Sequence, residues 1–203
     1  MTQAGYPSPG ARVFCIGRNY ADHAREMRAD LPERPVIFMK PPSSCRPPGE
    51  VAFPSGHGRV DFEGELVAVL SGDPRDPVAG AALGVDLTLR ELQAELKEKR
   101  LPWTVAKAFD GSALLGPVTP LDAAAFNELE FHVRVNGRPR QHGLAGNMIF
   151  SCDEIIAELT RYWKPESGDL LFTGTPEGVG PVHPGDLITM ESPQLGGVEW
   201  RLS

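Results

Sequence analysis

The chain has 203 residues, enough for one large domain or two small ones with a substantial hydrophobic core. Hydrophobic residues make up 41% and charged residues 23%, as in ordinary soluble globular proteins, and no apolar run approaches the ~20 residues that cross a bilayer. The formal net charge is −7 without any basic cluster, so we expect neither nucleic acid nor a membrane as a partner.

The N-terminal stretch and the cysteines indicate the compartment. The first residues, MTQAGYPSPGARVF, lack the basic and apolar regions of a secretory signal. The three cysteines are widely spaced and odd in number, which favours neither a disulfide framework nor structural zinc: Cys15, Cys45 and Cys152. We therefore expect a reduced, cytoplasmic protein. No repeat or linker interrupts the chain, so residues 1–11 are interpreted as an extension and residues 12–203 as one domain.

Short elements are predicted along the first part of the chain. Residues 12–17 and 35–40 have the pattern of buried strands. Residues 19–29 between them are typical of a short helix that Asn19 would cap. The proline-rich residues 41–58 indicate a long loop, which leads into the acidic stretch VDFEGELVAVL.

Two further helices are predicted from capping boxes. Residues 86–99 carry an apolar leucine stripe behind a T-x-x-E box formed by Thr88 and Glu91. An S-x-x-E box that starts at Ser151 begins a second helix over residues 151–163.

The remaining elements are predicted strands. Residues 129–141 alternate between apolar and polar side chains and turn at Asn136-Gly137, a strong hairpin signal. Three late strands follow over 169–176, 186–192 and 198–203. Strands outnumber helices and do not alternate strictly with them, so the fold class predicted is α+β, mainly β.

The acidic stretch over residues 60–70 places three carboxylates on one strand face, because side chains alternate with a period of two: Asp61, Glu63 and Glu65. Burying them unpaired is costly, so solvent or a cation must satisfy them. With Asp86 farther along, Glu63 and Glu65 could form an oxygen-rich site for Mg²⁺ or Mn²⁺. The alternative is a solvated acidic edge and an ordinary Asp before a helix, and spacing alone leaves both open.

Other polar residues could take part in chemistry. His23 and Glu26 share one face of the predicted helix and could activate a water, or they could form an exposed polar pair. Three cations near the ends of apolar segments could bind an anionic substrate or stabilise an enolate, or else extend to the surface: Arg18, Lys40 and Lys107.

The other histidines and the late glycine-rich loop give weaker signals. No metal-binding spacing is present among His57, His132, His142 and His183, and we expect His132 to be solvated on the polar face of its strand. The loop TGTPEGVGPVHPGD lacks the GK[ST] ending of a P-loop. A rival hypothesis is therefore a module that holds a small anion in this loop and performs no chemistry.

Taken together, eight blocks resemble the fumarylacetoacetate hydrolase family, in its small single-domain branch, from about Val13 to the C-terminus. They are GRNYADHAREM, PVIFMKPPSS, VDFEGELVAVL, DLTLRELQ, PWTVAKAFDGS, VNGRPRQ, MIFS and LLFTGTPEGVGPVHPGD. The resemblance implies a mixed β-sheet roll with short peripheral helices, usually a homodimer. The segment between Glu65 and Asp86 is shorter than we expect for this family.

The resemblance also implies roles for individual residues. Metal ligands for Mg²⁺ or Mn²⁺ would be Glu63, Glu65 and Asp86; catalytic residues would be His23, Glu26 and Lys107; substrate-binding residues would be Arg18, Lys40, Gln93 and Thr175. The implied enzyme is a hydrolase that cleaves a C–C bond in a small 2,4-dioxo acid through a metal-bound enolate. Oxaloacetate decarboxylation or tautomerisation and 2-hydroxyhepta-2,4-diene-1,7-dioate isomerisation share this intermediate, so the sequence leaves these alternatives open.

Overall fold

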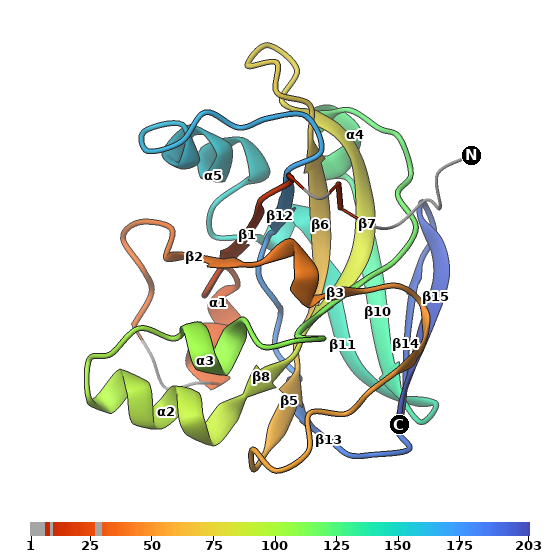
Figure 1. Ribbon diagram of the computed structural model, residues 1–203. Helices are drawn as coiled ribbons and strands as arrows, with labels where there is room; N and C mark the ends of the chain where they lie inside the picture. The colour runs from red at the N-terminus through yellow and green to blue at the C-terminus, as the bar shows by residue number, and fades with distance from the viewer. Residues whose placement is uncertain (1–6, 9, 27–29) are drawn as a thin grey trace.

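The computed structural model describes residues 7–8, 10–26 and 30–203, and their strands form three sheets (Figure 1). The largest sheet has seven strands in the order β2-β1-β12-β6-β7-β9-β3. Parallel pairing of β1 with β12 and of β3 with β9 occurs beside antiparallel pairing, so this sheet is mixed. Its strands are β1 (Val13–Ile16), β2 (Ile37–Lys40), β3 (Cys45–Arg46), β6 (Gly64–Leu70), β7 (Val78–Asp86), β9 (Ala113–Leu115) and β12 (Leu170–Phe172).

Two smaller sheets complete the β structure. A five-stranded sheet has the order β11-β10-β14-β15-β4 and a three-stranded sheet the order β13-β5-β8. The former contains β4 (Gly49–Val51), β10 (Glu130–Val135), β11 (Arg138–Leu144), β14 (Leu187–Ser192) and β15 (Gly196–Leu202). The latter contains β5 (Val60–Phe62), β8 (Thr88–Leu89) and β13 (Gly180–Val182).

The helices are short and lie at the periphery. Figure 1 shows α2 and α3 together at one end of the molecule and α4 and α5 at the other. They are α1 (Ala21–Glu26), α2 (Arg90–Glu98), α3 (Thr104–Lys107), α4 (Ala123–Asn127) and α5 (Cys152–Leu159), with 3₁₀ turns η1 (Pro42–Ser44) and η2 (Ala145–Asn147). This arrangement confirms the predicted mainly β fold with peripheral helices.

The main hydrophobic core joins the seven-stranded and five-stranded sheets. It combines Phe14 and Leu66 from the first with Phe131, Ile188 and Trp200 from the second, all almost completely shielded from solvent. Removing this much apolar surface from water is the dominant favourable contribution to folding. The core therefore fixes the position of β6, on which the acidic stretch continues.

The β10–β11 hairpin turns at Asn136-Gly137 as predicted, with positive φ angles of 52° and 74°. Its register then shifts between Val133 and Arg134. Arg134 faces Pro139, but Val133 faces Gln141, so Arg140 is the extra residue on β11. One extra residue on one strand is a β-bulge, and it reverses the faces of all residues beyond it. The bulge thus turns Gln141 inward and the next residue, His142, outward.

Three local predictions are wrong in detail. The acidic stretch is two strands, because β5 ends at Phe62 and β6 begins at Gly64 in a different sheet. Thr88 belongs to β8 and makes no capping contact, so α2 begins only at Arg90. Asn19 does not cap a helix, since its amide oxygen accepts a hydrogen bond from the backbone N–H of Phe150.

Other predictions agree with the structure, differ from it or lie beyond it. Ser151 and Glu154 form the expected capping box at the start of α5. Residues 41–58, which were predicted to be one long loop, differ from that prediction because they include the turn η1 and two short strands, β3 and β4. Part of the predicted N-terminal extension, residues 1–6 and 9, and the end of the predicted first helix, residues 27–29, lie outside the described residues.

The structure can be compared with two further expectations, that no segment crosses a membrane and that the cysteines form no disulfide framework. No helix among the described residues is long and apolar enough to span a bilayer. The three cysteines are all buried thiols.

Candidate active site

Three buried carboxylates meet where β6 and β7 pair. Glu63 precedes β6, Glu65 lies on it, and Asp86 ends β7, with the backbone N–H of Asp86 donating to the carbonyl of Glu63 over 2.8 Å. One oxygen from each carboxylate lies within 4.8 Å of the other two. The structure therefore brings together all three predicted metal ligands.

The glycine between the two glutamates is required by packing. A Cβ atom at Gly64 would lie 2.5 Å from a methyl carbon of Val133 on β10, so only glycine lets β6 approach the second sheet this closely. The side chain of Gln141, turned inward by the bulge, accepts from the Gly64 N–H over 2.9 Å. The E-G-E pattern thus results from close packing on one face and carboxylate placement on the other.

Two cations from distant segments are buried with the carboxylates. The Lys107 ammonium lies 2.6 Å from Glu63 Oε2, 2.8 Å from Asp86 Oδ2 and 2.7 Å from Thr88 Oγ1, and all three of its donors are used. Burial alone would lower the pKa of Lys107, but Asp86 and Glu63 raise it to about 12. Lys40 Nζ lies 2.8 Å from Asp86 Oδ1.

Arg90, at the start of α2, connects the cluster to Asp61. It donates to Asp61 Oδ2 over 2.8 Å, to Glu63 Oε1, and to Gln93 over 2.9 Å. Asp61 also accepts from Arg59 over 2.6 Å, and it is not one of the three clustered carboxylates. Burial would raise the pKa of Glu63, but the attraction of Lys107 and Arg90 outweighs it and holds that pKa well below its usual range.

Glu65 is the member of the cluster with the least compensation. It accepts one hydrogen bond, from the backbone N–H of Gly174 over 2.7 Å, and no ion pair with it occurs in the described part of the chain. Burial, followed by repulsion from Asp86 and Glu63, raises the pKa of Glu65 well above its usual value. A further cation at this cluster would therefore stabilise its ionised form.

The donor atoms also fit a hard divalent cation. Asp86 Oδ1 is fully buried and faces the ammonium of Lys40 at 2.8 Å, while two of the three Lys40 donors go to the carbonyls of Lys107 and Ser112. Clustered carboxylate oxygens of this kind are the ligands that Mg²⁺ and Mn²⁺ prefer. Glu63, Glu65 and Asp86 together could hold such an ion.

His23 and Glu26 form a pair on α1, and His23 lines the same pocket as Glu63. His23 Nδ1 lies 3.3 Å from Glu26 Oε2, and the backbone N–H of Gly178 donates to both oxygens of Glu26 over 3.2 and 3.3 Å. Burial lowers the pKa of His23, although Glu63 and Glu26 partly oppose this. The pair is therefore a neutral imidazole held in one orientation by a carboxylate.

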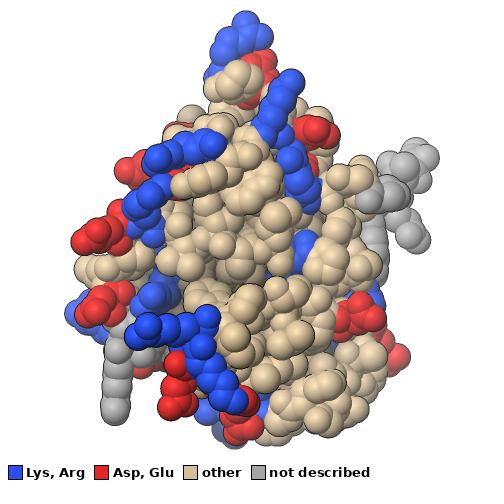
Figure 2. Space-filling view, turned by 60° about the vertical axis from the view of Figure 1, so that its left-hand side comes forward, with Lys and Arg blue, Asp and Glu red and all other residues tan. Residues whose placement is uncertain are grey.

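A pocket of about 440 Å³ is lined by Glu63 of the carboxylate cluster and by His23 and Lys107, whereas Glu65 and Asp86 lie outside its lining. Five residues singled out from the sequence line it: Arg18, His23, Glu63, Gln93 and Lys107. The helix α2 adds Arg90 and Lys97 to the wall, and Trp103 precedes α3. On the face that carries β2, α2 and α3, positive and negative side chains border a largely uncharged area, so no patch of one sign covers it (Figure 2).

Two predicted substrate-binding residues lie behind the pocket wall. Lys40 is fully buried and contacts Asp86 and backbone carbonyls. Thr175 is buried as well, and its hydroxyl donates to the Gly64 carbonyl over 2.8 Å while it accepts from Gln141. Both placements favour a role in holding the carboxylate-bearing strands.

Sequence reasoning missed three residues that build the site. Arg90 stands in the quoted block DLTLRELQ, but a lone Arg in a helix gives no sign of partners on another strand. The Asn19 amide group bridges Phe150 and Thr173, and so ties the segment before α1 to the loop after β12. Gln141 depends on the bulge, which has no signal in the alternation of residues.

The comparisons with known proteins show the family of the chain. The family model described as fumarylacetoacetate (FAA) hydrolase C-terminal matches residues 12–203, so the chain belongs to the fumarylacetoacetate hydrolase family, whose members are enzymes. It is 40% identical over 189 residues to the bovine protein "Oxaloacetate tautomerase FAHD1, mitochondrial", covering 88% of this chain and 86% of that one. It is 37% identical to the oxaloacetate tautomerase YcgM of Escherichia coli K12, covering 90% and 88%.

A solved structure is also similar. The fumarylpyruvate hydrolase from Pseudomonas aeruginosa, in complex with Mn²⁺ and pyruvate, matches with a TM-score of 0.87 at 36% identity, covering 98% of this chain and 94% of that one. The chain is therefore an enzyme of this family, with a carboxylate cluster able to hold a divalent metal ion and a small molecule as substrate.

Proposed function

We propose that this protein is a hydrolase dependent on Mg²⁺ or Mn²⁺ that cleaves a C–C bond in a small 2,4-dioxo acid. The observation that supports the proposal is that Glu63 and His23 line one pocket, with Glu26 in contact with the imidazole of His23. A cluster that binds metal explains only how a 2-oxo acid is held. A buried neutral imidazole beside it supplies the base that hydrolysis requires.

Glu63, Glu65 and Asp86 would hold the metal ion. When bound, the ion acts as a Lewis acid toward carbonyl and carboxylate oxygens of the substrate. Lys40 keeps Asp86 in place from behind, and Thr175 keeps β6 in register with the loop that follows β12. These contacts make the carboxylate geometry rigid before substrate arrives, which lowers the cost of binding.

His23 acts as the base in this proposal. Its Nδ1 atom donates to Glu26, which leaves Nε2 to accept a proton from a water in the pocket. The hydroxide adds to the distal carbonyl, and the C–C bond breaks so that its electron pair stays with the 2-oxo acid half as an enolate. That enolate takes up the proton held by His23, which gives a carboxylic acid and a 2-oxo acid as products. Gly178 holds Glu26 through its backbone N–H, so the imidazole does not need to reorient during the step.

Lys107 contributes positive charge where negative charge develops. Its ammonium is fixed between Glu63 and Asp86, so it faces the cluster without reorganisation. Arg18 and Gln93 lie on the pocket wall and would contact the substrate carboxylate and oxygen atoms. The substrate is thus held at one end by the metal cluster and along its length by the walls of the pocket.

A second candidate activity is keto–enol tautomerisation of oxaloacetate. It is supported by the identities of 37% and 40% to two proteins that carry this name. The same His23 base would move a proton between the C3 carbon and the 2-oxo oxygen, and no water attack would be needed. Isomerisation of 2-hydroxyhepta-2,4-diene-1,7-dioate uses the same kind of proton transfer.

The test is turnover of acetylpyruvate, fumarylpyruvate and oxaloacetate with Mg²⁺ or Mn²⁺ and after treatment with EDTA. We expect hydrolysis of a 2,4-dioxo acid that requires metal. Fast enol–keto exchange of oxaloacetate without any hydrolysis would replace the first candidate with the second. Light scattering on the purified protein tests the expected homodimer, and metal analysis distinguishes Mg²⁺ from Mn²⁺.

A further inference from the structure

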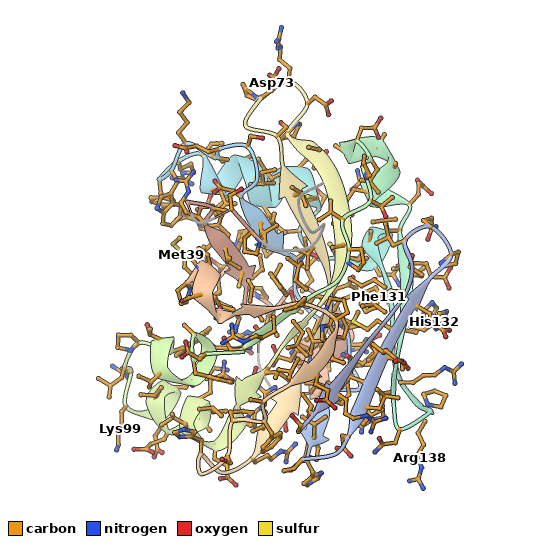
Figure 3. The ribbon with its side chains drawn as sticks, turned by 45° about the vertical axis from the view of Figure 1, so that its right-hand side comes forward. Met39, Asp73, Lys99, Phe131, His132 and Arg138 are labelled. Atoms are coloured by element: carbon orange, nitrogen blue, oxygen red, sulfur yellow. The ribbon has the colours of Figure 1, made fainter. Side chains whose placement is uncertain are left out.

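We propose that the protein has a second metal site, for a transition-metal ion such as Zn²⁺ or Cu²⁺, on the outer face of the five-stranded sheet. Its ligands are Glu130, His132 and His142. The side chains of β10 alternate, so Phe131 packs into the core while His132 points outward (Figure 3). Glu130 lies two residues earlier, on the same outward face.

The two imidazoles are brought together by the β-bulge in the hairpin. His132 faces His142 directly across the two strands. Without the extra residue at the bulge, His132 would face Gln141 and His142 would point inward. The pair is therefore a product of backbone register, which is why residue spacing along the chain does not indicate it.

The distances of the two imidazole nitrogens from the Glu130 carboxylate are close to those between ligands of one metal ion. Nε2 of His132 lies 3.2 Å and Nε2 of His142 lies 2.9 Å from the same oxygen, Glu130 Oε1. A tetrahedral ion with bonds near ~2.1 Å separates neighbouring ligand atoms by roughly 3.4 Å. The two rings are stacked, with centroids 4.4 Å apart and planes 9° from parallel, so one ring must rotate before both in-plane Nε2 lone pairs point at a single ion. Both side chains are exposed and have room for this rotation.

The donor set distinguishes this site from the carboxylate cluster. Two imidazole nitrogens and one carboxylate oxygen suit Zn²⁺, Cu²⁺ or Ni²⁺ and are poor ligands for Mg²⁺. Water completes the coordination, and Glu191, the partner of His132 on β14, adds negative charge on the same face. None of these residues lines the pocket of the carboxylate cluster. The two sites therefore differ in both place and metal preference.

The experiment is a Zn²⁺ titration by calorimetry in the presence of excess Mg²⁺, which occupies the carboxylate cluster. We expect one Zn²⁺ ion per chain. His132→Ala and His142→Ala should each weaken binding by at least about 10- to 100-fold, the range that loss of even an outer-sphere partner produces. His183→Ala is the matched control, because His183 is an exposed histidine beside Asp186 on another segment, and it should change nothing.

A spectroscopic signature separates specific binding from general attraction to the surface. Electron paramagnetic resonance of bound Cu²⁺ should show coupling to two imidazole nitrogens in the wild type and to one in each single variant. The proposal is overturned if the His132→Ala, His142→Ala double variant takes up Zn²⁺ as the wild type does. It is also overturned if Mg²⁺ displaces the Zn²⁺, which would place the ion in the carboxylate cluster.

Discussion

Lys40 and Asp86 form an ion pair that is completely hidden from solvent, with 2.8 Å between Lys40 Nζ and Asp86 Oδ1 and no exposed area on either side chain. Removing Lys40 leaves Asp86 with one cation, Lys107, which lies 2.8 Å from its other oxygen, and leaves the buried cluster of three carboxylates with one positive charge fewer. Lys40→Met should therefore lower the free energy of unfolding, by at most about 3–5 kcal/mol, measured by denaturant titration without added metal.

The matched control is Lys99→Met, since Lys99 pairs with Glu95 on the exposed surface of α2 and should change stability by less than about 1 kcal/mol. Equal stability of the two variants would mean that Lys107 alone is enough to compensate Asp86. Mg²⁺ should also stabilise Lys40→Met more than wild type, because a bound ion would replace part of the missing charge.

Lys107→Met should separate catalysis from stability. With metal bound we expect a large fall in kcat and a smaller change in KM, because the ammonium faces the charge that develops in the transition state. From the sequence alone no loss of stability is expected, but the contacts of Lys107 with Glu63 and Asp86 require about 3 kcal/mol of destabilisation in the metal-free protein.

Steady-state kinetics and melting curves with and without Mg²⁺ check this prediction. If the variant turns over substrate at the normal rate, whatever its melting temperature, then Lys107 only neutralises the buried carboxylates and takes no part in catalysis.

Glu63→Gln should abolish activity and leave the fold intact. The substitution removes one carboxylate from the cluster but keeps its size, and Arg90 and Lys107 retain Asp61 and Asp86 as partners. Calorimetry should show that the variant binds Mg²⁺ more weakly than wild type. Mg²⁺ should raise the melting temperature of wild type, because the ion binds only the native state, but not that of the variant. Full activity of wild type in EDTA would contradict the metal requirement.

His23→Ala should reduce hydrolysis of acylpyruvates by about 10²–10⁴-fold, the usual contribution of a positioned base. Decarboxylation of oxaloacetate needs no activated water and should fall less. Parallel rate measurements on both substrates check the difference. An equal loss of both activities would assign His23 a role in ordering the pocket.

The pH profile should reflect the burial of His23. A base acts in its neutral form, and burial lowers the pKa of His23 below its ordinary 6.5, so the acidic limb of kcat/KM should fall below pH 6.5. Glu26→Gln removes a carboxylate that raises this pKa, and the limb should move to still lower pH while kcat falls. A shift toward higher pH would show that another group titrates.

Local signals predicted much of the fold. The turn at Asn136-Gly137 and the capping box at Ser151 depend only on neighbouring residues, and both occur as expected. The box predicted at Thr88 failed because its hydroxyl accepts from Lys107, so a tertiary contact holds that residue in a strand. The acidic stretch is interrupted at Glu63 for a tertiary reason as well, because β5 pairs in the three-stranded sheet and β6 in the seven-stranded sheet.

The candidate site divides in a similar way. Its carboxylates and the His23–Glu26 pair were named from short blocks, because carboxylate spacing and helix periodicity are local properties. Lys107 was also named from its block, but Arg90 was not, because its contact with Glu63 spans 27 positions and leaves no local signal. The pairing of His132 with His142 was also missed, because a single bulge decides which residues face each other.

The parallel pairing of β1 with β12 has a consequence for biosynthesis. The contact between Arg12 and Asp169 beside it spans 157 residues, and Gly174 and Gly178, which hold Glu65 and Glu26, lie farther on still. A nascent chain must therefore be synthesised beyond Gly178 before these contacts with Glu65 and Glu26 can form. Such long-range closure is slow, and the partly synthesised chain must keep β6 and β7 from aggregating until β12 arrives.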